Sequence, residues 1–218
     1  MKKSFLILIL FGSLRFVSAQ GQIVNQNNFN AAVALYNQAI EHFDFGEVDQ
    51  ALLKFDKAIS LNPNNSDYFF GRASCHYDQK NYQKAAYDIT QAINLEPNQP
   101  DYHYYAGNIF FKLQDYKKAI ANYSKALETA PENPDININL TNVRYNRGVS
   151  ALSLGQYTNA RKDFEYVMNE DPEHADAVHN LAVALLKLGD RNQACSMFAK
   201  SEQLGVAKSK EYRSKYCK

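Results

Sequence analysis

The sequence repeats itself every 34 residues. Pro63, Pro97 and Pro131 mark this period, and each proline follows the same series of small and bulky side chains. Alanine stands twelve and five residues before each of these prolines, with Phe, Ile or Tyr between the two alanines. The series recurs before Pro172 and once more near the end of the sequence. Its members are Ala51, Phe55 and Ala58; Ala85, Ile89 and Ala92; Ala119, Tyr123 and Ala126; Ala160, Phe164 and Val167; and Ala194, Phe198 and Ser201. Such a period predicts a stack of similar units that share one core.

Each unit is expected to contain two helices. Ala51, Phe55, Ala58 and Ile59 have the spacing of one helical face, and the proline after them ends that helix. The first half of each unit carries a small residue that allows a close approach between helices, at Ala39, Ala73, Gly107, Gly148 and Ala182. The sequence therefore predicts an all-α array of helix-turn-helix units.

With these motifs the chain resembles a tetratricopeptide repeat protein of the exported bacterial type over residues 32–206. The resemblance implies a right-handed α-solenoid of about five hairpins, at residues 32–65, 66–99, 100–133, 134–174 and 175–206, with a capping helix at 207–218. The family's first-helix tryptophan is absent, and its positions hold Leu35, Phe69, His103, Arg144 and Val178.

The fourth unit departs from the period. Pro131 and Pro172 are 41 residues apart, which is seven more than the repeat. Seven residues make nearly two helical turns. We therefore expect a longer first helix in this unit, from about Asp135 to Leu154.

The first nineteen residues are typical of a secretory signal. Lys2 and Lys3 precede an apolar run, and small residues at Val17 and Ala19 predict cleavage after Ala19. The apolar run is too short to span a bilayer, although an uncleaved anchor is the alternative. Residues 20–31 are expected to form a flexible lead. A periplasmic or secreted protein of a Gram-negative-like bacterium follows from this interpretation, with no membrane insertion after cleavage.

Three cysteines are present, at Cys75, Cys195 and Cys217. Cys195 and Cys217 lie on either side of the turn predicted near residue 206, where an antiparallel hairpin places them opposite each other. They form either a disulfide, which export permits, or two buried thiols. Exported bacterial proteins of the repeat class that end in a similar Ala-Cys and Tyr-Cys pattern favour the disulfide by resemblance. Cys75 is expected to be a core thiol.

Charge and motifs argue against a nucleic-acid partner and against catalysis. Lys and Arg total 24 against 23 Asp and Glu, so no basic excess exists to neutralise phosphates. The five histidines lack metal-ligand spacing, and no phosphate-binding loop or nucleophile motif is present. We expect no enzymatic activity, no cofactor and no metal.

The remaining candidate site is a surface. In the family the first helices line the concave face of the solenoid, and here equivalent first-helix positions carry aromatic rings followed by asparagines. The candidate groove residues are Tyr36, Asn37, Phe70, Tyr104, Tyr105, Asn108, Tyr145, Asn146, His179 and Asn180, with Tyr77, Phe111, Lys112 and Lys187 further along the same helices. Such rings and amides suit a peptide, and the alternative is that the rings pack on neighbouring helices. The family's carboxylate-gripping residues are absent, because the corresponding places hold Tyr36, Ile40, Gly71, Asp101 and Tyr105.

The sequence therefore predicts a non-enzymatic adaptor that binds a protein or peptide. A self-associating envelope scaffold and a glycan-binding accessory module remain as alternatives.

Overall fold

A computed structural model describes residues 15–17, 23–130 and 138–217. Most of the expected signal peptide lies outside these residues. Strand β1 (Arg15–Val17) pairs antiparallel with β2 (Ile23–Asn25), with Arg15 opposite Asn25. The two strands stand on either side of the expected cleavage point. All the other elements of the described residues are helices.

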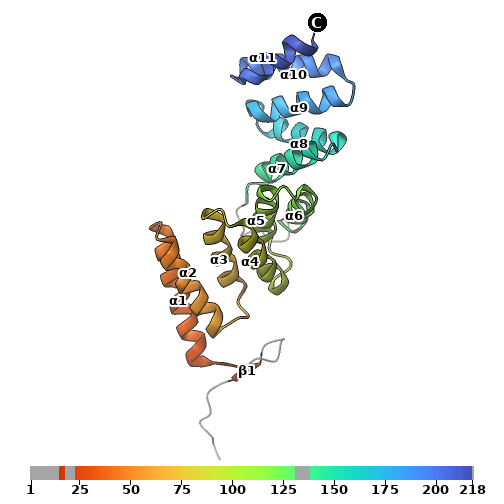
Figure 1. Cartoon of the computed structure of the whole chain (residues 1–218). Helices are drawn as coiled ribbons and strands as arrows, with labels where there is room; N and C mark the ends of the chain where they lie inside the picture. The colour runs from red at the N-terminus through yellow and green to blue at the C-terminus, as the bar shows by residue number, and fades with distance from the viewer. Residues whose placement is uncertain (1–14, 18–22, 131–137, 218) are drawn as a thin grey trace, which may run out of the picture.

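Within the described residues, ten helices form five consecutive hairpins, and an eleventh follows them (Figure 1). Their bounds are α1 Gln26–Asp44, α2 Val48–Leu61, α3 Ser66–Asp78, α4 Tyr82–Leu95, α5 Pro100–Lys112, α6 Tyr116–Thr129, α7 Leu140–Ser153, α8 Tyr157–Glu170, α9 Ala175–Lys187, α10 Arg191–Gln203 and α11 Ala207–Tyr216. The hairpins follow one another along an elongated array, from α1 and α2 at one end to α11 at the other. The α-solenoid predicted from the 34-residue period is confirmed.

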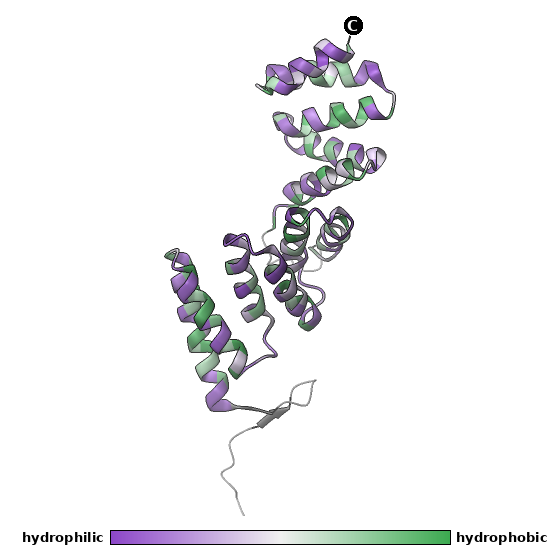
Figure 2. Ribbon diagram, viewed as in Figure 1, coloured by the Kyte–Doolittle hydropathy of each residue, from purple (hydrophilic) through white to green (hydrophobic). Residues whose placement is uncertain are grey.

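The repeated alanines and bulky residues form the core. Ala51, Ala85, Ala119, Ala160 and Ala194 are all fully buried, as are Phe55, Ile89, Phe164 and Phe198 at the bulky position. Hydrophobic and hydrophilic residues are mixed along most of the helices, whereas α9 is largely hydrophobic and α11 is largely hydrophilic (Figure 2). The buried clusters cross the unit boundaries, since Ile89 of α4 shares one cluster with Tyr102 and Ile109 of α5. A single hairpin could not bury this surface alone, so the array folds through contacts between neighbours.

Two glycines allow second-helix rings to pack against first helices. A Cβ added to Gly71 would lie 2.4 Å from the Phe55 ring, and one added to Gly107 would lie 2.4 Å from the Tyr123 ring. Any larger residue at either position would have to displace a buried ring. These two positions therefore fix where Phe55 and Tyr123 lie in the core.

The structure corrects two expected boundaries. Helix α1 begins at Gln26, so the expected flexible lead of residues 20–31 contains β2 and the first turns of α1. Helix α7 begins at Leu140, not near Asp135, and has 14 residues, so it is not extended. The physical reason is a cap: the Asn139 side chain accepts a hydrogen bond from the Asn142 N–H at 3.0 Å. The seven additional residues therefore precede α7 and do not lengthen it.

The last helix closes the array. Cys195 of α10 and Cys217, which follows α11, form a disulfide with their Cα atoms 5.6 Å apart. The Cys75 thiol is buried, and burial raises its pKa to about 12, with a smaller contribution from Asp78. No helix in the described part of the chain is both long and apolar enough to cross a bilayer.

Candidate functional site

A hollow of about 290 Å³ lies on the face formed by α3, α5 and α7, and we call it the central groove. Its lining residues are Tyr77, Tyr104, Asn108, Phe111, Lys112, Tyr123 and Asn146. All of them except Tyr123 project from first helices of three successive hairpins. The expected residues Tyr104, Asn108 and Asn146 are therefore brought together in one place.

Hydrogen bonds orient the two asparagines of the central groove. The buried Tyr123 hydroxyl donates to Asn108 Oδ1 at 2.8 Å, and Asn146 Nδ2 donates to the same oxygen at 3.2 Å. With its oxygen taken by two donors, Asn108 keeps its Nδ2 hydrogens for another acceptor, while Asn146 keeps its Oδ1 for a donor. The pair thus offers the two complementary groups that an extended peptide backbone requires.

Aromatic rings form the wall beside these amides. Tyr77 and Tyr104 line the hollow, and the Tyr104 centroid lies 6.2 Å from that of Tyr123. The expected residue Tyr105 is not one of the lining residues, and its ring packs edge-on against Phe70 at 5.0 Å and Tyr77 at 6.4 Å. Burial raises the pKa values of Tyr77, Tyr105 and Tyr123, so their phenols stay neutral at physiological pH. The wall is therefore an apolar surface with hydroxyl groups.

Three other expected groove positions hold rings that pack within the array. Tyr36 lies against Phe55 and Tyr68, with centroids 6.0 and 5.2 Å away. Tyr145 packs on Phe164 at 6.0 Å, and its hydroxyl accepts a hydrogen bond from Asn180 Nδ2 at 3.3 Å. Phe70 packs on Tyr102 at 5.0 Å as well as on Tyr105. At Tyr36, Phe70 and Tyr145 the rings therefore pack on neighbouring helices, as the alternative interpretation of the sequence expected, whereas Tyr104 lines the hollow. Asn37 is exposed near the N-terminal end of the array.

His179 does not line an open surface. It is 7% exposed, its Nδ1 lies 2.7 Å from Ser209 Oγ of α11, and its ring lies 5.5 Å from Tyr212. Burial lowers its pKa, and nearby Lys208 lowers it further. Helix α11 therefore covers the position that the first-helix pattern assigned to the groove.

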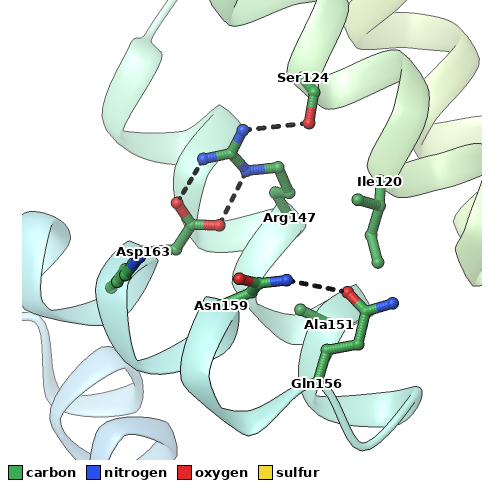
Figure 3. Close-up of a pocket in the computed structure, with 8 residues that line it drawn as sticks. Ile120, Ser124, Arg147, Ala151, Gln156, Asn159 and Asp163 are labelled. Atoms are coloured by element: carbon green, nitrogen blue, oxygen red, sulfur yellow. Dashed lines mark hydrogen bonds and ion pairs between the residues drawn. The ribbon is translucent and has the colours of Figure 1, made fainter.

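A second hollow, of about 240 Å³, lies among α6, α7 and α8 (Figure 3). On one side of it Arg147 binds Asp163 through two hydrogen bonds, at 2.8 and 2.6 Å, and its third nitrogen donates to Ser124 at 3.0 Å. Asp163 is 3% exposed. The arginine thus ties its own hairpin to the second helix of the preceding one.

The same arrangement occurs two hairpins earlier. Arg72 binds Asp88 at 2.9 and 2.6 Å and reaches Asp56 of α2 at 2.6 Å. The hairpin between them has a different contact one turn further along its first helix. There Phe110, at the position equivalent to His76 and Ala151, has Lys118 Nζ 5.1 Å from its ring centroid. Since the guanidinium groups are already bound by carboxylates, we assign both arrangements to links between hairpins.

Sequence reasoning missed Tyr123 as a groove residue. It occupies the buried position of the second helix, where the other hairpins have Phe55, Ile89, Phe164 and Phe198. The sequence did offer a signal, because Tyr123 places a hydroxyl group at a position that is apolar in the other four hairpins. It also missed the two arginine links, although Arg72 and Asp88, like Arg147 and Asp163, stand 16 residues apart at equivalent positions.

Comparison with protein families gives three matches along the chain. Residues 44–126 match the model of the anaphase-promoting complex (cyclosome) subunit 3, residues 107–148 match a TPR repeat model, and residues 151–200 match a tetratricopeptide repeat model. No curated protein matches the sequence.

Solved structures share the fold at low sequence identity. YrrB, described as a TPR protein with an unusual peptide-binding site, is 23% identical with a TM-score of 0.77, over 87% of this chain and 95% of that one. A MamA protein is 18% identical with a TM-score of 0.71, over 86% and 96%. MamA from Desulfovibrio magneticus RS-1 is also 18% identical with a TM-score of 0.70, over 80% and 95%.

Proposed function

Because this chain is built of tetratricopeptide repeats, we propose that it is an adaptor that binds an extended segment of another protein in its central groove. Repeats of this type generally mediate interactions between proteins and are typically non-catalytic. The Asn108–Asn146 pair supports the proposal most strongly, because Tyr123 and Asn146 both donate to Asn108 Oδ1 and no acceptor in the described part of the chain takes the Asn108 amide hydrogens.

The groove offers both recognition of the backbone and apolar contact. The Asn108 amide hydrogens donate to a peptide carbonyl, and Asn146 Oδ1 accepts from a peptide N–H. Tyr104, Tyr77 and Phe111 supply apolar area for side chains of the bound segment. The peptide-binding site named for YrrB, which shares this fold, is consistent with such a role.

A peptide selection tests the proposed groove. The full protein is used to select from a random display library of twelve-residue peptides, and enriched sequences are measured by fluorescence polarisation. Tyr104→Ala removes a ring that lines the hollow, and we expect about tenfold or greater weakening, which is the loss typical of an aromatic anchor.

The matched control is Tyr87→Ala. Tyr87 lies on α4, a second helix, and is 63% exposed, so its loss should leave the affinity unchanged. Circular dichroism verifies that both variants keep the helical content of the parent. Equal binding by the parent and the Tyr104→Ala variant would place the peptide outside this groove, and an absence of enriched peptides would reject the proposed function.

We further propose that the adaptor works outside the cytoplasm, in the periplasm or as a secreted protein. The basic and apolar start of the sequence and the Cys195–Cys217 disulfide support this location. Fractionation of cells that make the protein, followed by intact-mass measurement, is the test. A protein in the envelope or medium that lacks residues 1–19 supports it, whereas a full-length protein in the cytoplasm rejects it.

A further inference from the structure

One position on the first helices changes the sign of its charge along the array. The equivalent residues in the five hairpins are Asp44, Asp78, Lys112, Ser153 and Lys187. Asp78 is the last residue of α3 and Lys112 is the last residue of α5. The two opposite charges therefore stand at the same edge of two successive first helices.

Asp78 adds negative charge next to Tyr77, which lines the central groove. Burial is the main cause that raises the pKa values of Tyr77 and Tyr105, and the charge of Asp78 raises both further. Asp101 also acts on Tyr105, and burial raises the pKa of the Asp101 carboxyl. Among the described residues neither carboxylate has an ion-pair partner. Ring faces beside unpaired carboxylates favour a cation.

Lys112 adds positive charge to the groove beyond Tyr104. It lines the hollow together with Asn108, Phe111 and Asn146, and its side chain is exposed. No carboxylate of the described residues forms an ion pair with it. Lys112 thus lines the groove, while Asp78 stands at the equivalent edge of the preceding first helix, next to the lining residue Tyr77.

We propose that the bound segment carries a Lys or Arg beside Asp78, over Tyr77, and an Asp or Glu beside Lys112. This inference rests on the proposed function, since it specifies the partner of the same groove.

The library selection is repeated with a charge-exchanged protein, Asp78→Lys combined with Lys112→Asp, which keeps the net charge. Because Asn108 and Asn146 remain to fix the direction of the backbone, we expect the order of the cation and the anion in enriched peptides to reverse. Each protein should prefer its own peptides about tenfold, and the preference should shrink in high salt.

The control pair is Lys57→Asp combined with Glu170→Lys, which exchanges the same charges at exposed residues of the second helices α2 and α8. This variant should select the same peptides as the parent. The charge proposal would be overturned if the enriched peptides carry no fixed cation and anion, or if the parent and the charge-exchanged protein select the same order of the two charges. In either case, binding that still depends on Tyr104 would leave the proposed groove in place. If the parent protein itself shows no peptide binding that depends on Tyr104, the groove proposal is overturned as well.

Discussion

At the scale of the residue, single arginines bind the carboxylates that lie between neighbouring hairpins. Arg72 reaches two carboxylates in different surroundings: Asp88 is 1% exposed, whereas the Asp56 side chain is 57% exposed. Hydrogen bonds and charges from both aspartates raise the pKa of Arg72, although burial alone would lower it. A buried carboxylate depends on its partner far more than an exposed one does, because water cannot replace the lost contact.

We therefore expect Asp88→Ala and Asp56→Ala to differ sharply. Asp88→Ala leaves the guanidinium with one exposed partner and should lower the free energy of unfolding by about 3 kcal/mol. Asp56→Ala, the matched control on the same arginine, should lower it by less than about 1 kcal/mol. Urea unfolding followed by circular dichroism measures both, and equal losses would contradict the assigned roles.

At the scale of the element, caps determine where helices begin. Asn65, Asp115, Asn139 and Asp190 each accept a hydrogen bond from a backbone N–H three residues later. Asn81 precedes α4 without such a bond. The cap at Asn139 is the one that separates α7 from the longer connection before it.

Asn139→Ala tests this cap. Removal of the acceptor leaves the Asn142 N–H without its side-chain partner and should cost about 1 kcal/mol of unfolding free energy. Asn81→Ala is the control, because the Asn81 side chain caps nothing, and its effect should fall within about 0.5 kcal/mol of zero. A similar loss in both variants, measured by thermal unfolding, would show that capping does not explain the start of α7.

At the scale of the whole molecule, stability is distributed along the array. Each hairpin contacts its neighbours, so the two ends have support from one side only. At the C-terminal end α11 is strongly polar, with Ser209 its one buried residue among those described. The disulfide and the contacts of Tyr212 with Phe198 and His179 hold it in place.

Reduction of the disulfide should therefore loosen one end only. The bridge closes a segment of 22 residues, and its loss should cost that segment about 3 kcal/mol in the chain-entropy description. Hydrogen exchange before and after reduction should show faster exchange in α10 and α11 and no change in α1 to α4. Faster exchange throughout the chain would instead indicate that the array unfolds as one unit.

Much of this architecture could be predicted from the sequence, because the 34-residue period, the buried alanines and the prolines act locally. The start of α7 could not be, since seven extra residues fit a longer helix or a longer connection equally well until Asn139 is seen as a cap. For the groove, the period identified Tyr104, Asn108 and Asn146 as equivalent surface positions. It could not show that α11 covers His179 or that Tyr123 orients Asn108, because both depend on contacts between different helices.

The fit of Phe55 against Gly71 affects how such a chain can be recombined. The ring belongs to the first hairpin and the glycine to the second, so the pair crosses a unit boundary. A chimaera that exchanges one of these hairpins for a relative's would inherit only half of the pair, and a side chain at position 71 would collide with the ring. The first two hairpins should therefore be exchanged together as one segment. Gly107 and Tyr123 both belong to the third hairpin, which can be exchanged alone without separating this pair.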